Sequence, residues 1–399
     1  MNLMTTINPV RYCKLCVMSS QRPRITFDSE GVCSACSYAY RKHNVIDWKL
    51  REKELRDLLD KYRRNDGSWD VVVPASGGKD SSFVAHQLKY KYNMNPLTVT
   101  WAPHVYTDIG WQNFQAMLHS GLDNISGQPN GIIHRKLTRL FFEKIGDPFQ
   151  PFIFGQKSFP VKIAVKYNIP LIMYGENGEV EYGGDRKNEN SPTHNLDDDV
   201  IKHYFSGISP EDLVAIGFDK KEINPYLFPP MDEIHKVGVQ CHFFGYYKKW
   251  TPQENFYYAV KNCGFKPNPE RSEGTYSKYA SIDDKIDGFH YYLMFLKFGI
   301  GRATSDAAHE IRDGHITRDE GVALVRRYDG EFPKKHFKVF LDYINMTEEN
   351  FWEVLEKFRA KHLWEKTGGI WRLKYQVTPH EEYIPNEEQP EQERICIAV

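Results

Sequence analysis

The sequence predicts an α/β protein in which a parallel sheet is covered by helices on both faces. Two observations lead to this fold class. Short apolar runs alternate with longer segments of helical period, which is the pattern of strands joined by crossover helices. A glycine-rich turn at residues 76–81 lies between the first of these runs and a helical segment. A cysteine-rich segment precedes this region and a helical segment follows it.

Composition limits the classes of function. The 399 residues include 52 Lys and Arg against 53 Asp and Glu, so the formal net charge is −1. This balance argues against a protein that holds nucleic acid or a membrane surface mainly by bulk charge. We find no apolar stretch of membrane-spanning length and no secretory signal pattern. We therefore expect a cytoplasmic protein that binds neither nucleic acid nor membrane.

Four cysteines in the predicted N-terminal segment, residues 1–45, have the spacing of a zinc ribbon. Cys13 with Cys16, and Cys33 with Cys36, each form a C-x-x-C turn. Two such turns can complete a tetrahedron around one metal ion. Two disulfides or a redox motif are alternatives, but nothing in the sequence indicates an oxidising compartment. We predict a structural Zn²⁺ site, because four cysteines leave no open position for chemistry.

The second predicted region, residues 46–250, carries the α/β alternation. Helical spacing is found at residues 48–63, 83–92, 111–122 and 159–167. Strand-like apolar runs are found at residues 69–75, 96–101, 131–134, 170–174 and 239–246. Parallel sheets bind ligands at the carboxyl ends of their strands. The loops after residues 75, 101 and 174 are therefore the places where we expect functional side chains.

The third predicted region, residues 251–380, is expected to be helical. A start signal at 251–254 and a stop at Gly264 bound one helix, and further helices are predicted at 287–298 and 351–364. Residues 381–399 are acidic and contain proline, so we expect a mobile tail.

The turn at residues 76–81, Ser-Gly-Gly-Lys-Asp-Ser, has the properties of a phosphate-binding loop, although its spacing differs from that of a Walker A motif. Gly77 and Gly78 let the backbone curl so that successive N–H groups face an anion. The helix that begins near Lys79 adds the positive end of its dipole. The polar side chains of the turn supply a cation, two hydroxyls and a carboxylate that could hold Mg²⁺, from Lys79, Ser76, Ser81 and Asp80.

In its context after a buried strand, this turn resembles the PP-loop of the ATP pyrophosphatase superfamily, which includes GMP, NAD and asparagine synthetases and tRNA thiolases. The resemblance implies a Rossmann-like, HUP-type fold. It also implies that residues 76–81 bind ATP with Mg²⁺, that Lys79 and Asp80 act in catalysis, and that ATP is split between its α and β phosphates.

Five later blocks, at residues 174–179, 181–184, 273–279, 283–285 and 297–302, resemble the N-acetyl sugar amidotransferase family. The likeness extends from Tyr12 to about Trp371. Members of that family make acetamidino sugars for bacterial surface polysaccharides, such as lipopolysaccharide O-antigen, and for flagellar glycans. The resemblance implies a carbon–nitrogen ligase that releases AMP and pyrophosphate. Its substrate would be a nucleotide-activated N-acetyl sugar, which reacts through an O-adenylated imidate.

The same resemblance implies partners and substrate contacts. Ammonia would come from a separate glutaminase subunit through a synthase-like subunit that delivers it. The predicted substrate contacts are Glu176, Asn177, Glu179, Lys297 and Arg302. Two of them, Lys297 and Arg302, flank a glycine-containing helix end. There they could complement the helix dipole or bind the diphosphate of the activated sugar.

Two other functions fit parts of the sequence. A tRNA-thiolating PP-loop enzyme would need a cysteine pair or an iron–sulfur cluster, but Cys241, Cys263 and Cys396 are isolated from one another. A non-catalytic nucleotide-binding scaffold would not require the intact Lys79 and Asp80 of the loop. We therefore favour the amidotransferase.

Overall fold

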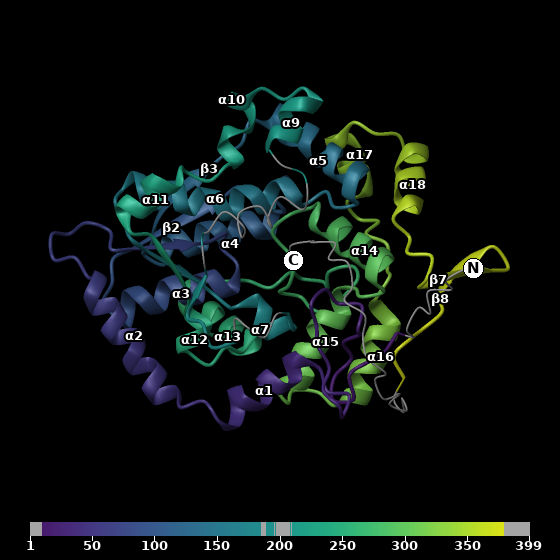
Figure 1. Ribbon diagram of the computed structural model, residues 1–399, viewed down its shortest axis with the longest axis horizontal. Coiled ribbons are helices and arrows are strands. Elements are labelled where there is room, and N and C mark those ends of the chain that lie inside the picture. The colour runs from purple at the N-terminus through teal and green to yellow at the C-terminus, as the bar shows by residue number, and fades with distance from the viewer. Residues whose placement is uncertain (1–9, 185–188, 195, 197–207, 209, 379–399) are drawn as a thin grey trace, which may run out of the picture.

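A six-stranded sheet forms the centre of the structure, a computed structural model that describes residues 10–184, 189–194, 196, 208 and 210–378 (Figure 1). Its strand order is β3–β2–β1–β4–β6–β5. The first five strands in this order are parallel, and β5 pairs antiparallel with β6. The strands are β1 (Val71–Pro74), β2 (Pro96–Trp101), β3 (Asp123–Gly127), β4 (Leu171–Tyr174), β5 (Thr193–His194) and β6 (Gln240–Phe243). The predicted parallel sheet is confirmed.

Helices cover both faces of this sheet, because alternate residues of its central strand enter different cores. Val71 and Val73 pack in a core with α2, α3 and α4, whereas Val72 packs in a second core with α6 and α11. Apolar side chains on both faces are typical of parallel strands. The helices of this region are α2 (Trp48–Tyr62), α3 (Lys79–Tyr90), α4 (Asp108–His119), α5 (Gly131–Ile145), α6 (Gln150–Lys166), α7 (Gly178–Tyr182), α9 (Pro210–Ile216), α10 (Lys220–Ile223), η2 (Asn224–Tyr226), α11 (Met231–Val237), α12 (Phe244–Tyr247) and α13 (Pro252–Cys263).

One strand was predicted at the wrong place. Residues 131–134 begin α5, because the side chain of Asn130 accepts hydrogen bonds from the backbone nitrogens of Ile132 and Ile133 and so caps a helix. The strand lies earlier, at β3, whose partly exposed, polar residues form the edge of the sheet. The run at 239–246 is also divided, since β6 ends at Phe243 and α12 follows.

The C-terminal part contains α14 (Asp287–Phe298), α15 (Arg302–Arg312), α16 (Arg318–Tyr328), α17 (Phe337–Ile344), α18 (Glu348–Lys357) and the hairpin of β7 (Trp364–Thr367) and β8 (Ile370–Leu373). The prediction for 287–298 is confirmed. The helix predicted over 351–364 ends earlier, and a hairpin follows it. Its turn contains Gly368 and Gly369, both with positive φ. The predicted tail, residues 381–399, lies outside the described residues.

The N-terminal segment packs against these C-terminal helices rather than forming a core of its own. The four cysteines share one buried cluster with Met294, Ala307, Ala308 and Val322. Figure 1 shows the loops that precede α1 (Ser34–Asn44), in purple, against α15 and α16. Residues that are far apart in the sequence therefore fold as one unit.

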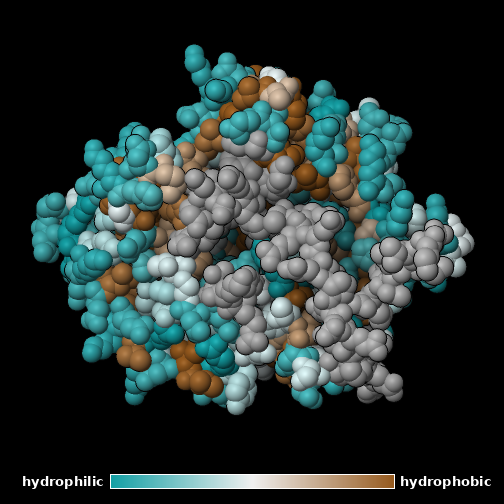
Figure 2. Space-filling model, viewed as in Figure 1, coloured by the Kyte–Doolittle hydropathy of each residue, from teal (hydrophilic) through white to brown (hydrophobic). Residues whose placement is uncertain are grey.

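The surface in view is largely polar. Hydrophilic residues make up most of the coloured surface in Figure 2. In the part of the chain that the structure describes, we find no helix that combines the length and the apolar character needed to cross a membrane.

Candidate functional site

The turn at residues 76–81 joins the buried strand β1 to the helix α3, at the carboxyl edge of the sheet. The backbone nitrogen of Ala75 still donates to Val99 of β2, 2.9 Å away, and Gly78 is the N-cap of α3. The turn therefore directs its backbone towards the space above the sheet, with the N-terminal end of α3 behind it. This is the strand–loop–helix geometry that a PP-loop requires.

Gly77 cannot be replaced by a larger residue without a change in the backbone. Its φ of +87° lies in the left-handed region. A Cβ atom added there would lie 2.5 Å from the Cα of Phe114, in α4. The missing side chain therefore allows the loop to pack directly on α4.

A pocket opens in front of this turn, and it has two walls that are far apart in the sequence. The turn and α4 form one wall, and a segment around Asp283 together with Arg302 forms the other. The residues that line it are Ser76, Gly77, Gly78, Lys79, Asp80, Gly110, Asn113, Phe265, Tyr279, Ala280, Ser281, Ile282, Asp283 and Arg302.

Each wall contributes one cation. Lys79 forms an ion pair with Asp80, and its ammonium lies 5.4 Å from the ring centroid of Tyr279. Arg302 is held by Asp306, at 3.1 Å, and donates a hydrogen bond to the hydroxyl of Tyr291. Two fixed cations beside exposed backbone N–H groups suit a polyphosphate.

Carboxyl groups surround the same loop. The pKa of Asp283 is raised to about 6, chiefly by burial and also by the neighbouring Asp287 and Asp284, against the lowering effect of a hydrogen bond with Ser76. Burial also raises the pKa of Glu176, which follows β4, and the negative charge of Asp80 adds to that increase. Lys79 has the opposite effect on the pKa of Glu176. The predicted residue Glu176 therefore lies within electrostatic range of the turn.

Asp80 has a further buried partner. The side-chain nitrogen of Asn255, in α13, donates to an oxygen of Asp80 at 3.0 Å. We did not predict Asn255, and a contact across 175 positions leaves no local signal in a sequence. The same holds for Asn113, which exchanges two hydrogen bonds with the backbone of Lys266 and so fixes the rim of the pocket.

The other predicted residues lie outside the pocket. Asn177 caps α7 by accepting a hydrogen bond from the nitrogen of Glu179, 3.1 Å away, and Glu179 forms an ion pair with Arg24. Lys297 donates to the backbone oxygen of Ile145 at 3.2 Å. The hydroxyl of Ser81 donates to the backbone oxygen of Gly78, 3.2 Å away, within the first turn of α3.

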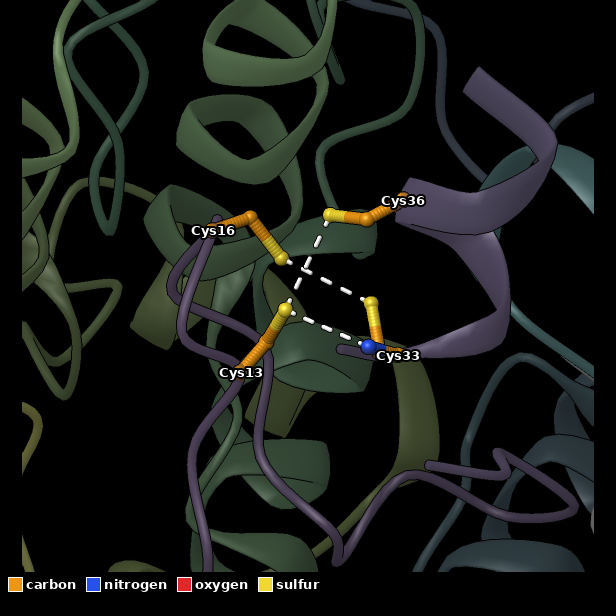
Figure 3. A group of neighbouring side chains, drawn as sticks. All are labelled: Cys13, Cys16, Cys33 and Cys36. Atoms are coloured by element: carbon orange, nitrogen blue, oxygen red, sulfur yellow. Dashed lines mark hydrogen bonds between the residues drawn. The ribbon is translucent and has the colours of Figure 1, made fainter. Parts of the chain in front are cut away.

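The four N-terminal cysteines form a second site. Their sulfur atoms point towards one another in Figure 3, and all four lie within 4.8 Å of each other. Cys13 and Cys36, and likewise Cys16 and Cys33, have their sulfur atoms 3.7 Å apart. A tetrahedral zinc ion with Zn–S bonds of about 2.3 Å separates its sulfurs by about 3.8 Å, whereas a disulfide needs about 2 Å. The group therefore fits a metal ion and not two disulfides.

Hydrogen-bond donors lie close to the cysteine sulfurs and favour their thiolate form. The backbone nitrogens of Leu15 and Cys33 donate to the sulfur of Cys13, at 3.4 and 3.3 Å. The guanidinium of Arg312, at the end of α15, lies 4.0 Å from the sulfur of Cys16. Such donors stabilise the negative charge of a metal-bound cysteine group.

The second wall of the pocket lies in a segment that is similar to a known protein family. Residues 273–378 match the family described as LPS biosynthesis protein WbpG-like, C-terminal domain. The C-terminal part of the chain is thus similar to a WbpG-like C-terminal domain. The loop at residues 76–81 therefore forms one wall of the pocket. The segment that matches this family, residues 273–378, which we call the WbpG-like domain, supplies Tyr279, Asp283 and Arg302 to the other.

Other similarities are more distant. An uncharacterized protein of Methanocaldococcus jannaschii is 27% identical over 88 residues, which are 22% of this chain and 31% of that relative. The chain thus matches less than a third of the length of this curated relative. An NH3-dependent NAD synthetase from Campylobacter jejuni is 15% identical, with a TM-score of 0.29, and the match covers 57% of this chain and all of the synthetase. An NMN synthetase from Francisella tularensis is 14% identical, with a TM-score of 0.26, over 54% and 87% of the two chains.

Proposed function

We propose that the protein is an ATP-dependent amidotransferase that converts the N-acetyl group of a nucleotide-activated sugar into an acetamidino group. The observation that carries this proposal is the pocket shared by the PP-loop and the WbpG-like domain. A phosphate-binding loop supplies the means of activation, and a domain of lipopolysaccharide biosynthesis supports a sugar as the acceptor. With ATP and an activated sugar as substrates, we expect the reaction to take place in the cytoplasm.

The chemistry requires activation, because an amide carbon resists attack by ammonia. In the proposed reaction the N-acetyl oxygen attacks the α-phosphorus of ATP, pyrophosphate leaves, and an O-adenyl imidate forms. Ammonia then adds to the imidate carbon, and AMP departs with the former amide oxygen. The amide oxygen is thus exchanged for nitrogen, at the expense of one ATP.

The position of each residue at the pocket indicates its role in the proposed reaction. The backbone N–H groups of the loop, Lys79 and Arg302 face the pocket, where they would neutralise the phosphate charge that develops as pyrophosphate leaves. Mg²⁺ would be held by Asp80, with Glu176 and Asp283 close to the loop, and it would offset the negative charge of the triphosphate. Positioning and charge neutralisation are the protein's main contributions.

Ammonia is proposed to come from a glutaminase subunit, through a synthase-like subunit that delivers it. Outside the N-terminal group, the cysteines in the described part of the chain are Cys241 and Cys263. Both are buried, and burial raises the pKa of each thiol to about 12. A neutral, buried thiol is a poor nucleophile for glutamine hydrolysis.

The four N-terminal cysteines are proposed to hold a structural Zn²⁺ ion. Their sulfur spacing supports zinc, and a closed set of four thiolates leaves no position for a substrate.

Mass spectrometry of nucleotide-activated N-acetyl sugars, incubated with the protein, ATP, Mg²⁺ and ammonium, tests the proposal. We expect a product about 1 Da lighter than the substrate, since NH replaces O, together with AMP and pyrophosphate. The matched control is the Lys79→Ala variant, which should give no product. Unchanged sugars in every reaction, with the protein folded and ATP bound, would contradict the proposal.

A further inference from the structure

The cysteine-rich segment contacts the segment that follows β4, at the same edge of the sheet as the loop at residues 76–81. We define this segment, residues 176–184, as the β4–α7 segment. Arg22 donates from its Nε to the backbone oxygen of Gly183 at 3.1 Å, and Arg24 forms an ion pair with Glu179. A Cβ atom added to Gly183 would lie 3.2 Å from Ile25. The two segments therefore pack closely.

A buried cation strengthens this contact. Lys42, in α1, is 1% exposed, and its ammonium lies 3.1 Å from Glu181 of the β4–α7 segment and 3.0 Å from Asp313, after α15. It also donates to the backbone oxygen of Trp250, at 2.9 Å. A buried carboxylate without a nearby positive charge destabilises the folded state. Removal of Lys42 would leave the Glu181 carboxylate without this partner.

Two of the four cysteines lie at the start of the helix that carries this cation. Cys33 is the N-cap of α1, and Cys36 lies within its first turn, whereas Lys42 lies near its end. A helix whose N-terminal end is bound to a metal ion carries the rest of its side chains in fixed positions. Lys42 is thus held by the metal site at one end of α1 and by Glu181 at the other.

The β4–α7 segment in turn lies beside the loop that forms one wall of the pocket, because β4 pairs in parallel with β1, with Ile172 opposite Val72. It begins with Glu176, which lies within electrostatic range of Lys79 and Asp80. Its other end contains Tyr182, whose ring centroid lies 4.5 Å from that of His309, in α15. The segment therefore connects the PP-loop to the WbpG-like domain.

We propose that the cysteine-rich segment positions the β4–α7 segment at the ATP pocket through Lys42 and Glu181, so that metal binding and nucleotide binding favour each other. This inference rests on the proposed function, because it assumes that the pocket binds ATP. Lys42 and Glu181 are positioning residues that act through Glu176. Thermodynamic linkage requires the effect to be mutual, so nucleotide must raise metal affinity by the factor by which metal raises nucleotide affinity.

The test measures metal affinity with the full chain, by competition with a chromophoric zinc chelator, with and without a non-hydrolysable Mg–ATP analogue. We expect the analogue to raise the affinity for zinc by about 5-fold or more. Calorimetric titration of the same analogue shows whether nucleotide binds. If the analogue binds and zinc affinity does not change, the inference fails while the proposed function stands. If the analogue does not bind at all, both fail.

Variants separate positioning from general stability. Lys42→Met should keep one zinc ion per chain but bind the analogue several-fold more weakly, and the analogue should no longer raise its zinc affinity. Lys49→Met, an exposed lysine on α2, is the matched control and should behave as the parent. If Lys42→Met does not fold, the double variant Lys42→Met/Glu181→Gln removes both partners of the pair and should show the same loss of coupling. Parental coupling in a folded, zinc-loaded variant would overturn the inference.

Discussion

Asp284 accepts hydrogen bonds from both the backbone nitrogen and the ring Nδ1 of His104, each at 2.7 Å. Both side chains are almost fully buried, with 0% of His104 and 2% of Asp284 exposed. The same carboxylate accepts from the nitrogen of Ile286, at 2.9 Å. The pair joins the loop after β2 to the WbpG-like domain, and it lies next to Asp283 in the pocket. This contact therefore helps to hold the two walls of the pocket together, along with the hydrogen bonds of Thr107 to the backbone of Ile282 and Asp283.

Replacement of Asp284 by alanine should loosen the second wall. It removes the acceptor of three backbone nitrogens and one buried ring, so we expect the free energy of unfolding to fall by about 2–4 kcal/mol. Urea denaturation checks this value. Asp342→Ala, at an exposed position of α17, should change the free energy of unfolding little. Equal losses in the two variants would show that the Asp284 contact has no special role.

Asp283 should give the stability of the protein a defined pH dependence. Its pKa is about 6 in the folded protein, above the ordinary value of 3.8. Between these values the folded state binds more protons than the unfolded state, so the free energy of unfolding falls as the pH rises from about 4 to about 6. Above about pH 6 the Asp283 carboxyl is ionised in the folded protein as well, so the free energy of unfolding is lowered by the full cost of keeping this charge at its site.

The Asp283→Asn variant carries no ionisable group at this position, so it does not lose stability as the pH rises. We expect it to exceed the parent in free energy of unfolding by on the order of 1–3 kcal/mol at pH 7–8, and to lose this advantage below about pH 4. Urea denaturation across this pH range provides the comparison. Parallel pH profiles of parent and variant would show that Asp283 does not titrate as stated.

Arg302 and Lys297 should differ in their effects, although both were predicted to bind substrate. Arg302 lines the pocket opposite Lys79, whereas Lys297 donates to the backbone of Ile145. We expect Arg302→Ala to lower kcat/KM for ATP by about 10–100-fold. Lys297→Ala should leave the KM for ATP within about 2-fold and lower thermal stability instead. Similar losses of ATP affinity in both variants would argue against the pocket described here.

Zinc removal should unfold the N-terminal segment. We expect one zinc ion per chain in the parent, and a loss of both zinc and thermal stability in Cys16→Ser, because structural zinc sites supply folding free energy. Metal analysis and thermal unfolding test this expectation. Cys241→Ser and Cys263→Ser should keep zinc and amidotransferase activity, and loss of activity in them would instead favour a thiolating enzyme.

The parts of the fold that the sequence predicts are those that local residues determine. The PP-loop turn and the C-x-x-C pairs each depend on a few adjacent residues, and the buried strands have continuous apolar runs. β3 was misplaced because an edge strand with polar residues lacks such a run. The separation of Arg302 from Lys297 could not be predicted, since it depends on how α14 and α15 pack against distant segments. Asn255 reaches Asp80 only through the tertiary fold.

The identity of the nucleotide products tests the central claim most directly. Phosphorus NMR of a reaction that contains the protein, ATP, Mg²⁺, ammonium and a nucleotide-activated N-acetyl sugar distinguishes the two ways of cleaving ATP. The PP-loop assignment predicts AMP and pyrophosphate, formed only when the sugar is present and abolished in Lys79→Ala. Formation of ADP and phosphate, or equal rates in the parent and in a correctly folded Lys79→Ala variant, would contradict it.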